Sequence, residues 1–226
     1  MDGHIYKSFD KELNDLKENL LLVGGLVEKA INNAITALGE RNSELAATVI
    51  ADDDTIDNRE VKIDELCLKI LALRQPAARD LRFITTAIKV NYDLERIGDM
   101  AVNICERVQE LNAEPQLKPY IVLPKMADTV QYMLKQSLNA FVQENPDLAW
   151  QVIKHDEKVD QLLDQIFHEL LDYMVGDFNT VSRATRLLFI SKYLERIADH
   201  AVNIAELVIF MVQGKIVRHL KVVKGE

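Results

Sequence analysis

The chain has 226 residues, of which 48% are hydrophobic and 28% charged, and its formal net charge is −9. This apolar content is enough for a core and argues against a chain that is disordered throughout. An acidic chain does not attract nucleic acid through its overall field, which argues against nucleic acid as a partner. Eight glycines, five prolines and 6% aromatic residues favour helices over sheets.

The ends and the most apolar segments indicate a soluble protein. The start lacks a basic region followed by an apolar run, and no stretch of about 18 apolar residues is seen. The nearest candidate, 187–212, is interrupted by five charged residues. Cys67 and Cys105 form no Cys-x-x-Cys pair and lie in apolar segments, which is typical of buried thiols in a reducing compartment. We therefore expect a cytoplasmic protein.

The first predicted helix covers about residues 9–38, where hydrophobic residues recur at steps of three and four. Gly24 and Gly25 lie inside it and weaken it by roughly 1 kcal/mol each. We expect both glycines to be tolerated if another helix packs closely against them.

Five further helices are predicted from the same spacing, from caps and from breakers. Pro76 separates the second from the third, Asn145 and Pro146 begin the fifth, and Gly214 ends the sixth. The segment 112–124 holds three prolines and is the clear break in the chain. The predicted helices cover about 43–73, 77–111, 125–143, 145–176 and 180–213.

An internal repeat relates the two sides of that break. Residues 94–108 match 194–208 at 11 of 15 positions, where chance gives about one match. Residues 53–57 likewise match 156–160. We therefore predict an all-α fold of two tandem three-helix bundles related by internal duplication. Its parts are a first repeat over 1–112, a Pro-rich linker over 113–124, a second repeat over 125–214 and a basic tail over 215–226.

Acidic residues four apart are kept in both repeats. Residues at i and i+4 share one helix face, so each pair presents two carboxylates in the same direction. If the second and third helices of a repeat pack antiparallel, four carboxylates converge and form an all-oxygen site that suits a hard cation. The eight candidate ligands are Asp53, Asp57, Glu95, Asp99, Asp156, Asp160, Glu195 and Asp199. Asn103, Asn203, Glu106 and Glu206 continue the same side of their helices and are second-rank candidates.

Two simpler interpretations of these acids stay open. A single acidic pair on a helix is usually a solvated surface, and duplicated ion pairs with Arg96 or Arg196 would give the same pattern. Glu60 and Asp64 extend the acidic row but align with Leu163 and Phe167, which predicts that they are surface residues. His200 aligns with Met100 and is expected to be structural.

The sequence holds none of the common catalytic motifs for phosphate binding, nucleophilic attack or zinc hydrolysis. Three functions are compatible with the sequence: a non-enzymatic adaptor, a metalloenzyme acting on phosphoesters through clustered metals, and a structural helical protein. The first is favoured, so we expect no enzymatic activity.

Three stretches of this chain resemble the PhoU family of phosphate-uptake regulators. They are 73–82 (Leu-Arg-Gln-Pro-Ala-Ala-Arg-Asp-Leu-Arg), the duplicated Glu-Arg-Ile-Gly/Ala-Asp, and 214–219 (Gly-Lys-Ile-Val-Arg-His). The similarity extends from about Phe9 to His219. The second copy of Arg-Asp-Leu-Arg is degenerate, because 179–186 keeps arginines but loses the Arg-Asp pair.

The resemblance implies properties that spacing does not show. PhoU proteins are expected to bind metal at their acidic pairs, iron first, with manganese, magnesium or zinc as alternatives. The resemblance implies a negative regulator of the phosphate-starvation response and of phosphate uptake. It also implies partners, namely the ATPase subunit of the phosphate ABC transporter and the phosphate-sensing histidine kinase. A homodimer that reaches the membrane only through these partners is expected.

Overall fold

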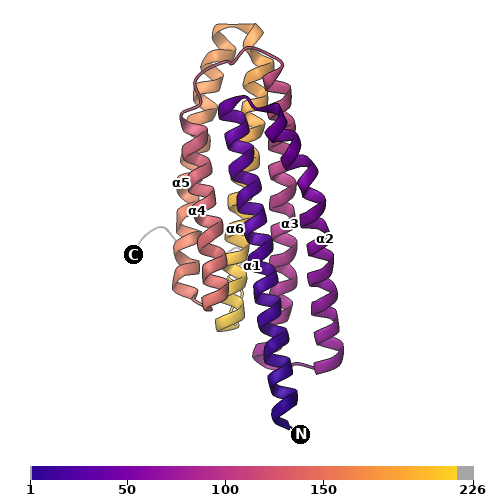
Figure 1. Ribbon diagram of the computed structural model, residues 1–226. Helices are drawn as coiled ribbons and strands as arrows, with labels where there is room; N and C mark the ends of the chain where they lie inside the picture. The colour runs from indigo at the N-terminus through magenta and orange to yellow at the C-terminus, as the bar shows by residue number, and fades with distance from the viewer. Residues whose placement is uncertain (1, 218–226) are drawn as a thin grey trace, which may run out of the picture.

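The computed structural model describes residues 2–217, with side chains from residue 8 onward, so the basic residues from Arg218 to Lys224 lie outside the described part. Within it the chain forms six α-helices and one short 3-10 helix, and no strand (Figure 1). The predicted all-α fold is confirmed. The elements are α1 (Asp2–Glu40), α2 (Ser43–Arg74), α3 (Ala78–Asn112), α4 (Val122–Gln143), α5 (Pro146–Gly176), η1 (Phe178–Thr180) and α6 (Val181–Gln213).

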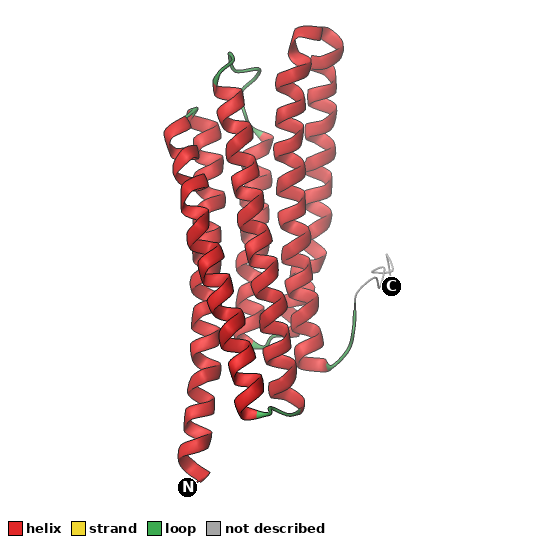
Figure 2. Cartoon of the chain, turned by 90° about the vertical axis from the view of Figure 1, so that its right-hand side faces the viewer, coloured by secondary structure: helices red, strands yellow, loops and turns green. Residues whose placement is uncertain are grey.

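Two three-helix bundles lie side by side along their length. Helices α1, α2 and α3 pack on one another, as do α4, α5 and α6, and the bundles meet along α3–α6 and α1–α4. Successive helices run up and down, so α3 and α6 are antiparallel (Figures 1 and 2). The two repeats therefore point in opposite directions. The α2–α3 turn lies at one end of the molecule and the α5–α6 turn at the other.

The short turns inside the two repeats are built in the same way. Arg41 and Glu144 follow α1 and α4, and both adopt left-handed backbone with φ of 55° and 51°. Asn42 and Asn145 come next, and each side-chain oxygen accepts a backbone N–H from the first turn of the following helix. The duplication thus extends to the caps, beyond the residues that revealed it in the sequence.

Helix α1 carries the longest apolar stretch that could be mistaken for a membrane span among the described residues. The stretch Ser8–Glu40 is long and apolar enough to cross a membrane, by length and composition alone. Its stripe includes Leu16, Leu20, Val27 and Ile31, and all four are almost fully buried in the bundle. The stripe is therefore accounted for by core packing. The prediction that 187–212 comes nearest to a membrane-spanning length of apolar sequence is wrong, because Ser8–Glu40 passes that test instead.

A polar and aromatic cluster fastens the repeats at the end that carries the α2–α3 turn. Glu144 forms ion pairs with Arg79 of α3 and with Lys17 of α1, the second at 3.3 Å. The Lys17 ammonium also lies 5.1 Å from the ring centre of Phe83, which stacks on Phe141 of α4. The Arg-Asp-Leu-Arg stretch thus contributes an arginine to the contact between repeats.

The opposite end is fastened by arginines of α6 and of the α1–α2 turn. Arg186 pairs with Glu110 at 2.7 Å and with Glu114 at 3.0 Å, both near the end of α3. Arg183 donates to the Pro115 carbonyl at 2.9 Å. Arg41 donates to three carbonyls at the end of α3 over 2.5–3.2 Å, which satisfies groups that a helix end leaves free.

The segment between the repeats, 113–121, is shorter than the predicted linker. Pro124 is the third residue of α4, where a proline is tolerated because the first turn has no internal partner for its missing N–H. The breaker therefore lies inside the helix that it was expected to precede.

The two adjacent glycines of α1 differ in their surroundings. A Cβ at Gly24 would lie 2.4 Å from Leu138 Cδ1 of α4, whereas a Cβ at Gly25 would meet no atom within 4 Å. Close packing between the repeats thus explains Gly24 but not Gly25.

We predict opposite effects of alanine at these two positions. Gly25→Ala should stabilise the fold by roughly 0.5–1 kcal/mol, because alanine favours the helix and nothing is displaced. Gly24→Ala should destabilise it by about 1 kcal/mol, because Leu138 must move within a packed contact. Urea unfolding of both variants measures this. Equal stabilisation by the two alanines would contradict the close α1–α4 contact.

We also predict a pH signature for Glu144. Burial acts to raise the pKa of this carboxyl, but Arg79 and Lys17 outweigh it and hold the pKa below its usual value. The ionised group therefore stabilises the fold at neutral pH, and the contribution is lost as the pH falls through the lowered pKa. Glu144→Gln should cost about 0.5–1 kcal/mol near neutral pH and almost nothing near pH ~3. A cost that persists at low pH would show that the charge is not responsible.

Candidate metal sites

A row of carboxylates follows the contact between α2 and α3. The two helices pack antiparallel, as the site hypothesis required. Asp53 and Asp57 come from α2, and Glu95 and Asp99 from α3. Asp53 interacts electrostatically with Asp57 and Asp99, and Glu95 with Asp99 and Asp57. The structure therefore brings the four predicted side chains of the first repeat into one field of negative charge.

Gly98 permits this close approach. A Cβ at this position would lie 3.2 Å from Ile56 Cδ1 and 3.3 Å from Asp53 Oδ1. Ile56 is buried in the core, so α2 is drawn against α3 at the level of the carboxylates. The equivalent residues of the second repeat are Ala198 and the smaller Val159, both buried. Ala198 is larger than Gly98, and Val159 is smaller than Ile56, so the change on one helix compensates for the change on the other.

The carboxyl groups of the first repeat hold their protons more tightly than usual. Burial, followed by the charges of Asp57, Asp99 and Asp54, raises the pKa of Asp53 to about 6. Burial and the charge of Asp99 raise the pKa of Glu95, although Arg96 opposes this. Ionised carboxylates here are thus both partly desolvated and mutually repelled.

The second repeat builds the same arrangement between α5 and α6. Burial, followed by the charges of Asp160, Asp199 and Glu195, raises the pKa of Asp156 to about 6. Burial and the Glu195 charge also raise the pKa of Asp199, against the opposing charge of His200. All eight candidates therefore fall into two groups of four, one per repeat.

The cations next to the two groups are not equivalent. In the first repeat Arg96 Nη1 lies 2.8 Å from Asp99 Oδ2. In the second repeat Lys192 Nζ lies 2.9 Å from Glu195 Oε1, and the position that matches Lys192 is Tyr92. Each group thus carries one ion pair that offsets a single charge, and the ion-pair interpretation explains only part of each acidic group.

The first repeat extends its acidic row by one further turn. The fully buried Asn91 donates its amide to Asp64 Oδ1 at 3.1 Å and to the Glu60 carbonyl at 2.9 Å. Burial, then the charges of Asp64 and Asp57, raises the pKa of Glu60. These two acids were predicted to be surface residues, but both are half-buried and belong to the row. The second repeat has Leu163, Phe167 and Ser191 instead.

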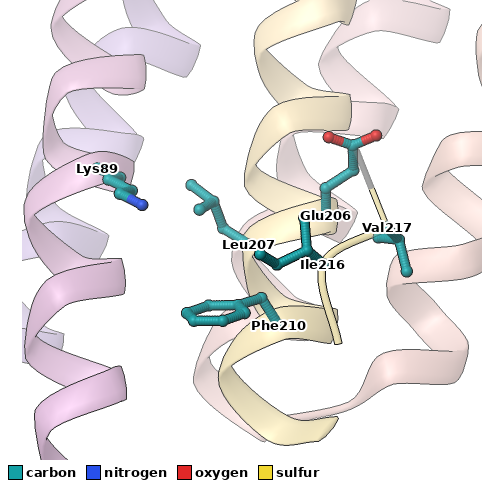
Figure 3. Close-up of a pocket in the computed structure, with 6 residues that line it drawn as sticks. All are labelled: Lys89, Glu206, Leu207, Phe210, Ile216 and Val217. Atoms are coloured by element: carbon teal, nitrogen blue, oxygen red, sulfur yellow. The ribbon is translucent and has the colours of Figure 1, made fainter. Parts of the chain in front are cut away.

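His200, which was expected to be structural, and the second-rank candidates Asn203 and Glu206 of α6 face other neighbours. His200 Nδ1 lies 2.8 Å from Asp93 Oδ1 across the α3–α6 contact, and Asn203 lies 3.5 Å from the same oxygen. Glu206 lines a small hollow of about 110 Å³ whose walls also include Lys89 and Phe210 (Figure 3). None of these contacts involves the carboxylate row, so His200 joins the two repeats.

The carboxylate groups are chemically suited to a hard cation, but their positions in the structure do not form a coordination site. Carboxylate oxygens are the ligands preferred by magnesium, calcium, manganese and iron, and a cation would relieve the repulsion described above. Among residues 2–217, however, no three Asp, Glu, His or Cys side chains are placed so as to hold a metal ion. Coordination therefore requires the carboxylates to rotate toward the ion.

Removing one charge from each row should stabilise the protein when metal is absent. Asp53→Asn and Asp156→Asn keep the side-chain shape and remove a partly desolvated, repelled charge. With allowance for solvent screening, we predict a gain of about 1 kcal/mol for each variant in chelator-treated protein at neutral pH. Chemical unfolding measures it, with Glu18→Gln on the exposed face of α1 as control. A loss of stability in both variants would contradict the repulsion.

Comparisons with known proteins agree with the duplicated architecture. The model of the PhoU domain matches twice, over residues 20–108 and 123–208. The PhoU homolog of Pseudomonas aeruginosa, a phosphate-specific transport system accessory protein, is 43% identical over 96% of this chain and 90% of its own length. The homolog of Aquifex aeolicus with the same description is 44% identical over 96% of this chain and 98% of its own.

Solved structures share the whole fold. The crystal structure of PhoU from Pseudomonas aeruginosa superposes with a TM-score of 0.88 at 43% identity, covering 92% of this chain and all of that one. The phosphate transport system regulatory protein PhoU from Streptococcus pneumoniae gives a TM-score of 0.86 at 31% identity, covering 92% of this chain and 98% of its own. Two domain matches, relatives aligned over nearly their full length and a common fold agree: the chain belongs to the PhoU family.

Proposed function

We propose that this protein is a metal-binding adaptor of the phosphate transport system that restrains phosphate uptake and the phosphate-starvation response when phosphate is plentiful. The relatives are named accessory or regulatory proteins of that system, which supports a regulatory role. The observation that carries the metal-binding part is the duplicated carboxylate row. Both repeats keep four acids at a helix contact where burial and repulsion work against their ionised forms.

The metal would join two helices within each repeat. The proposed ligands are Asp53, Asp57, Glu95 and Asp99 in the first repeat and their equivalents Asp156, Asp160, Glu195 and Asp199 in the second. The carboxylates of α2 and α3, and those of α5 and α6, would hold the ion, which would supply the positive charge that offsets their repulsion. Iron is the expected metal, with manganese, magnesium and zinc as alternatives.

The proposed partners are the ATPase subunit of the phosphate ABC transporter and the phosphate-sensing histidine kinase. A long bundle offers separate surfaces to two proteins, which suits an adaptor. The proposal includes a homodimer in the cytoplasm that reaches the membrane only through these partners. A role without enzymatic turnover fits the lack of catalytic motifs in the sequence.

Metal content provides the first test. Protein purified without chelator or an affinity metal should contain bound metal by mass spectrometry. Glu95→Gln/Asp99→Asn and Glu195→Gln/Asp199→Asn should each lower the content by roughly half, because each double variant disables one of two equivalent sites. The charge-matched control Glu18→Gln/Glu40→Gln, on exposed positions, should leave it unchanged. Absence of metal after supply of iron, manganese and magnesium would count against the metal sites alone.

Regulation is tested in cells. Deletion of the gene should switch on phosphate-starvation genes in phosphate-rich medium, as read from a phosphatase reporter. The wild type and Glu18→Gln/Glu40→Gln should restore repression, whereas the two carboxylate variants should not if metal is needed for signalling. Normal repression in the deletion strain would refute the adaptor. Turnover of a phosphoester by the metal-loaded protein, abolished in the carboxylate variants, would favour a metalloenzyme instead.

A further inference from the structure

The α5–α6 turn projects beyond the neighbouring helix ends and carries an exposed apolar surface. It is the orange end at the top of Figure 1. Phe167, Leu171 and Val175 recur at steps of four along α5, so they share one face, and Phe178 follows on η1. Val175 is 81% exposed and Phe178 is 86% exposed. We call this surface, formed by these four side chains, the apolar tip.

The apolar tip is held in place by its own hydrogen bonds. Asp177 Oδ1 accepts the backbone N–H of Asn179 at 2.9 Å, and the Thr180 hydroxyl donates to the Tyr173 carbonyl at 2.8 Å. These bonds end α5 and connect it to α6 through the short helix η1, without a flexible loop. The backbone that carries Phe178 is therefore fixed in advance, which lowers the entropy lost when another surface covers it.

The fold does not require these apolar side chains. In the first repeat the positions that match Phe167 and Val175 are Asp64 and Ala72, whereas Leu171 matches the likewise exposed Leu68. That repeat connects its second and third helices without an aromatic residue at the position of Phe167. Side chains as exposed as Val175 and Phe178 contribute little to the core. A contiguous apolar surface without a structural role is characteristic of a site of interaction.

The charge around the apolar tip limits what can bind there. Residues 159–182 contain five acidic residues and no lysine or arginine, whereas the stretch 56–79 of the first repeat contains five basic and four acidic residues. Asp172 is exposed and makes no hydrogen bond or ion pair within the described part of the chain. It lines a shallow hollow of about 460 Å³ together with Asp177 and Arg183, and the Arg183 guanidinium already donates to the Pro115 carbonyl. Two carboxylates therefore border the apolar tip, and the one arginine at the hollow is engaged within the chain.

We propose that the apolar tip is a docking surface for a partner protein that presents apolar side chains bordered by lysine or arginine. Apolar groups of the partner would cover Val175 and Phe178, and a basic group would meet Asp172 at the hollow. An anionic membrane surface would be repelled by the same acids. A second copy in a two-fold arrangement would place acid against acid, which also disfavours it.

The proposal rests on the adaptor function, because it assigns one of the two proposed partners to this end of the molecule. The experiment measures binding of the purified transporter ATPase subunit and of the cytoplasmic part of the kinase to the full chain. Val175→Ser/Phe178→Ser removes the apolar groups from exposed positions, and Asp172→Lys reverses the bordering charge. The control is Leu68→Ser/Leu73→Ser in the first repeat, where the side chains are 63% and 66% exposed.

The expected result is that one of the two proteins binds the Val175→Ser/Phe178→Ser variant at least tenfold more weakly, with the thermal midpoint of the variant unchanged. Asp172→Lys should weaken the same complex and reduce its dependence on salt, whereas the control should bind normally. Wild-type binding that persists undiminished in both tip variants would overturn the docking surface while leaving the adaptor in place.

Two other outcomes would also overturn the assignment. Binding of neither protein to the wild type would remove the adaptor function and this proposal with it. Self-association of the wild type that is lost in Val175→Ser/Phe178→Ser, seen by light scattering and accompanied by unchanged partner binding, would assign the apolar tip to a second copy.

Discussion

The close packing of α2 on α3, and of α5 on α6, is the constraint on which the rest of the structure depends. Burying an isoleucine such as Ile56 stabilises the fold by about 1.5–3 kcal/mol, and many side chains along each contact are buried. The shift of the Asp53 pKa to about 6 corresponds to a cost of at most about 3 kcal/mol before solvent screening. Hydrophobic packing therefore prevails and holds like charges together. This leaves each repeat with a negative site that a cation would stabilise.

The two repeats are more alike in their backbone and helix packing than in their polar and surface side chains. Caps, left-handed turn residues and the matched volumes at Gly98/Ile56 and Ala198/Val159 recur in both repeats. By contrast, Asp93 pairs with His200 only because the two repeats differ at these positions. Charge differs most, since an acidic row continues along α2 where α5 has the apolar tip. A symmetric scaffold whose two ends differ in charge and apolar surface suits the proposed adaptor, which would bind two different partners.

Helix order, the Asn145 cap and the eight carboxylates followed from the sequence because each depends on local spacing or on the repeat. The contacts between the two repeats could not be predicted from the sequence. Arg183 and Arg186 lie one helical turn after the positions that align directly with Arg79 and Arg82. No local sequence pattern shows which groups these two arginines contact. Glu60 and Asp64 were dismissed because their equivalents are apolar, although their spacing of four and their place beside Asp57 were a usable signal. The tertiary contact of Asn91 with Asp64, and the effect of Asp64 and Asp57 on the pKa of Glu60, show that they belong to the row.

Packing holds the carboxylates together against their mutual repulsion, and in the proposed function a bound cation relieves it. The most direct test of this relief is the thermal midpoint of chelator-treated protein as iron, manganese or magnesium is added, compared between the wild type and Asp53→Asn/Asp156→Asn. A ligand that binds only the folded state raises the midpoint in proportion to the logarithm of its concentration. The midpoint of the wild type should start lower, rise with metal and overtake that of the variant, which should respond weakly. Parallel curves, or a wild type that no metal shifts, would contradict relief by a cation.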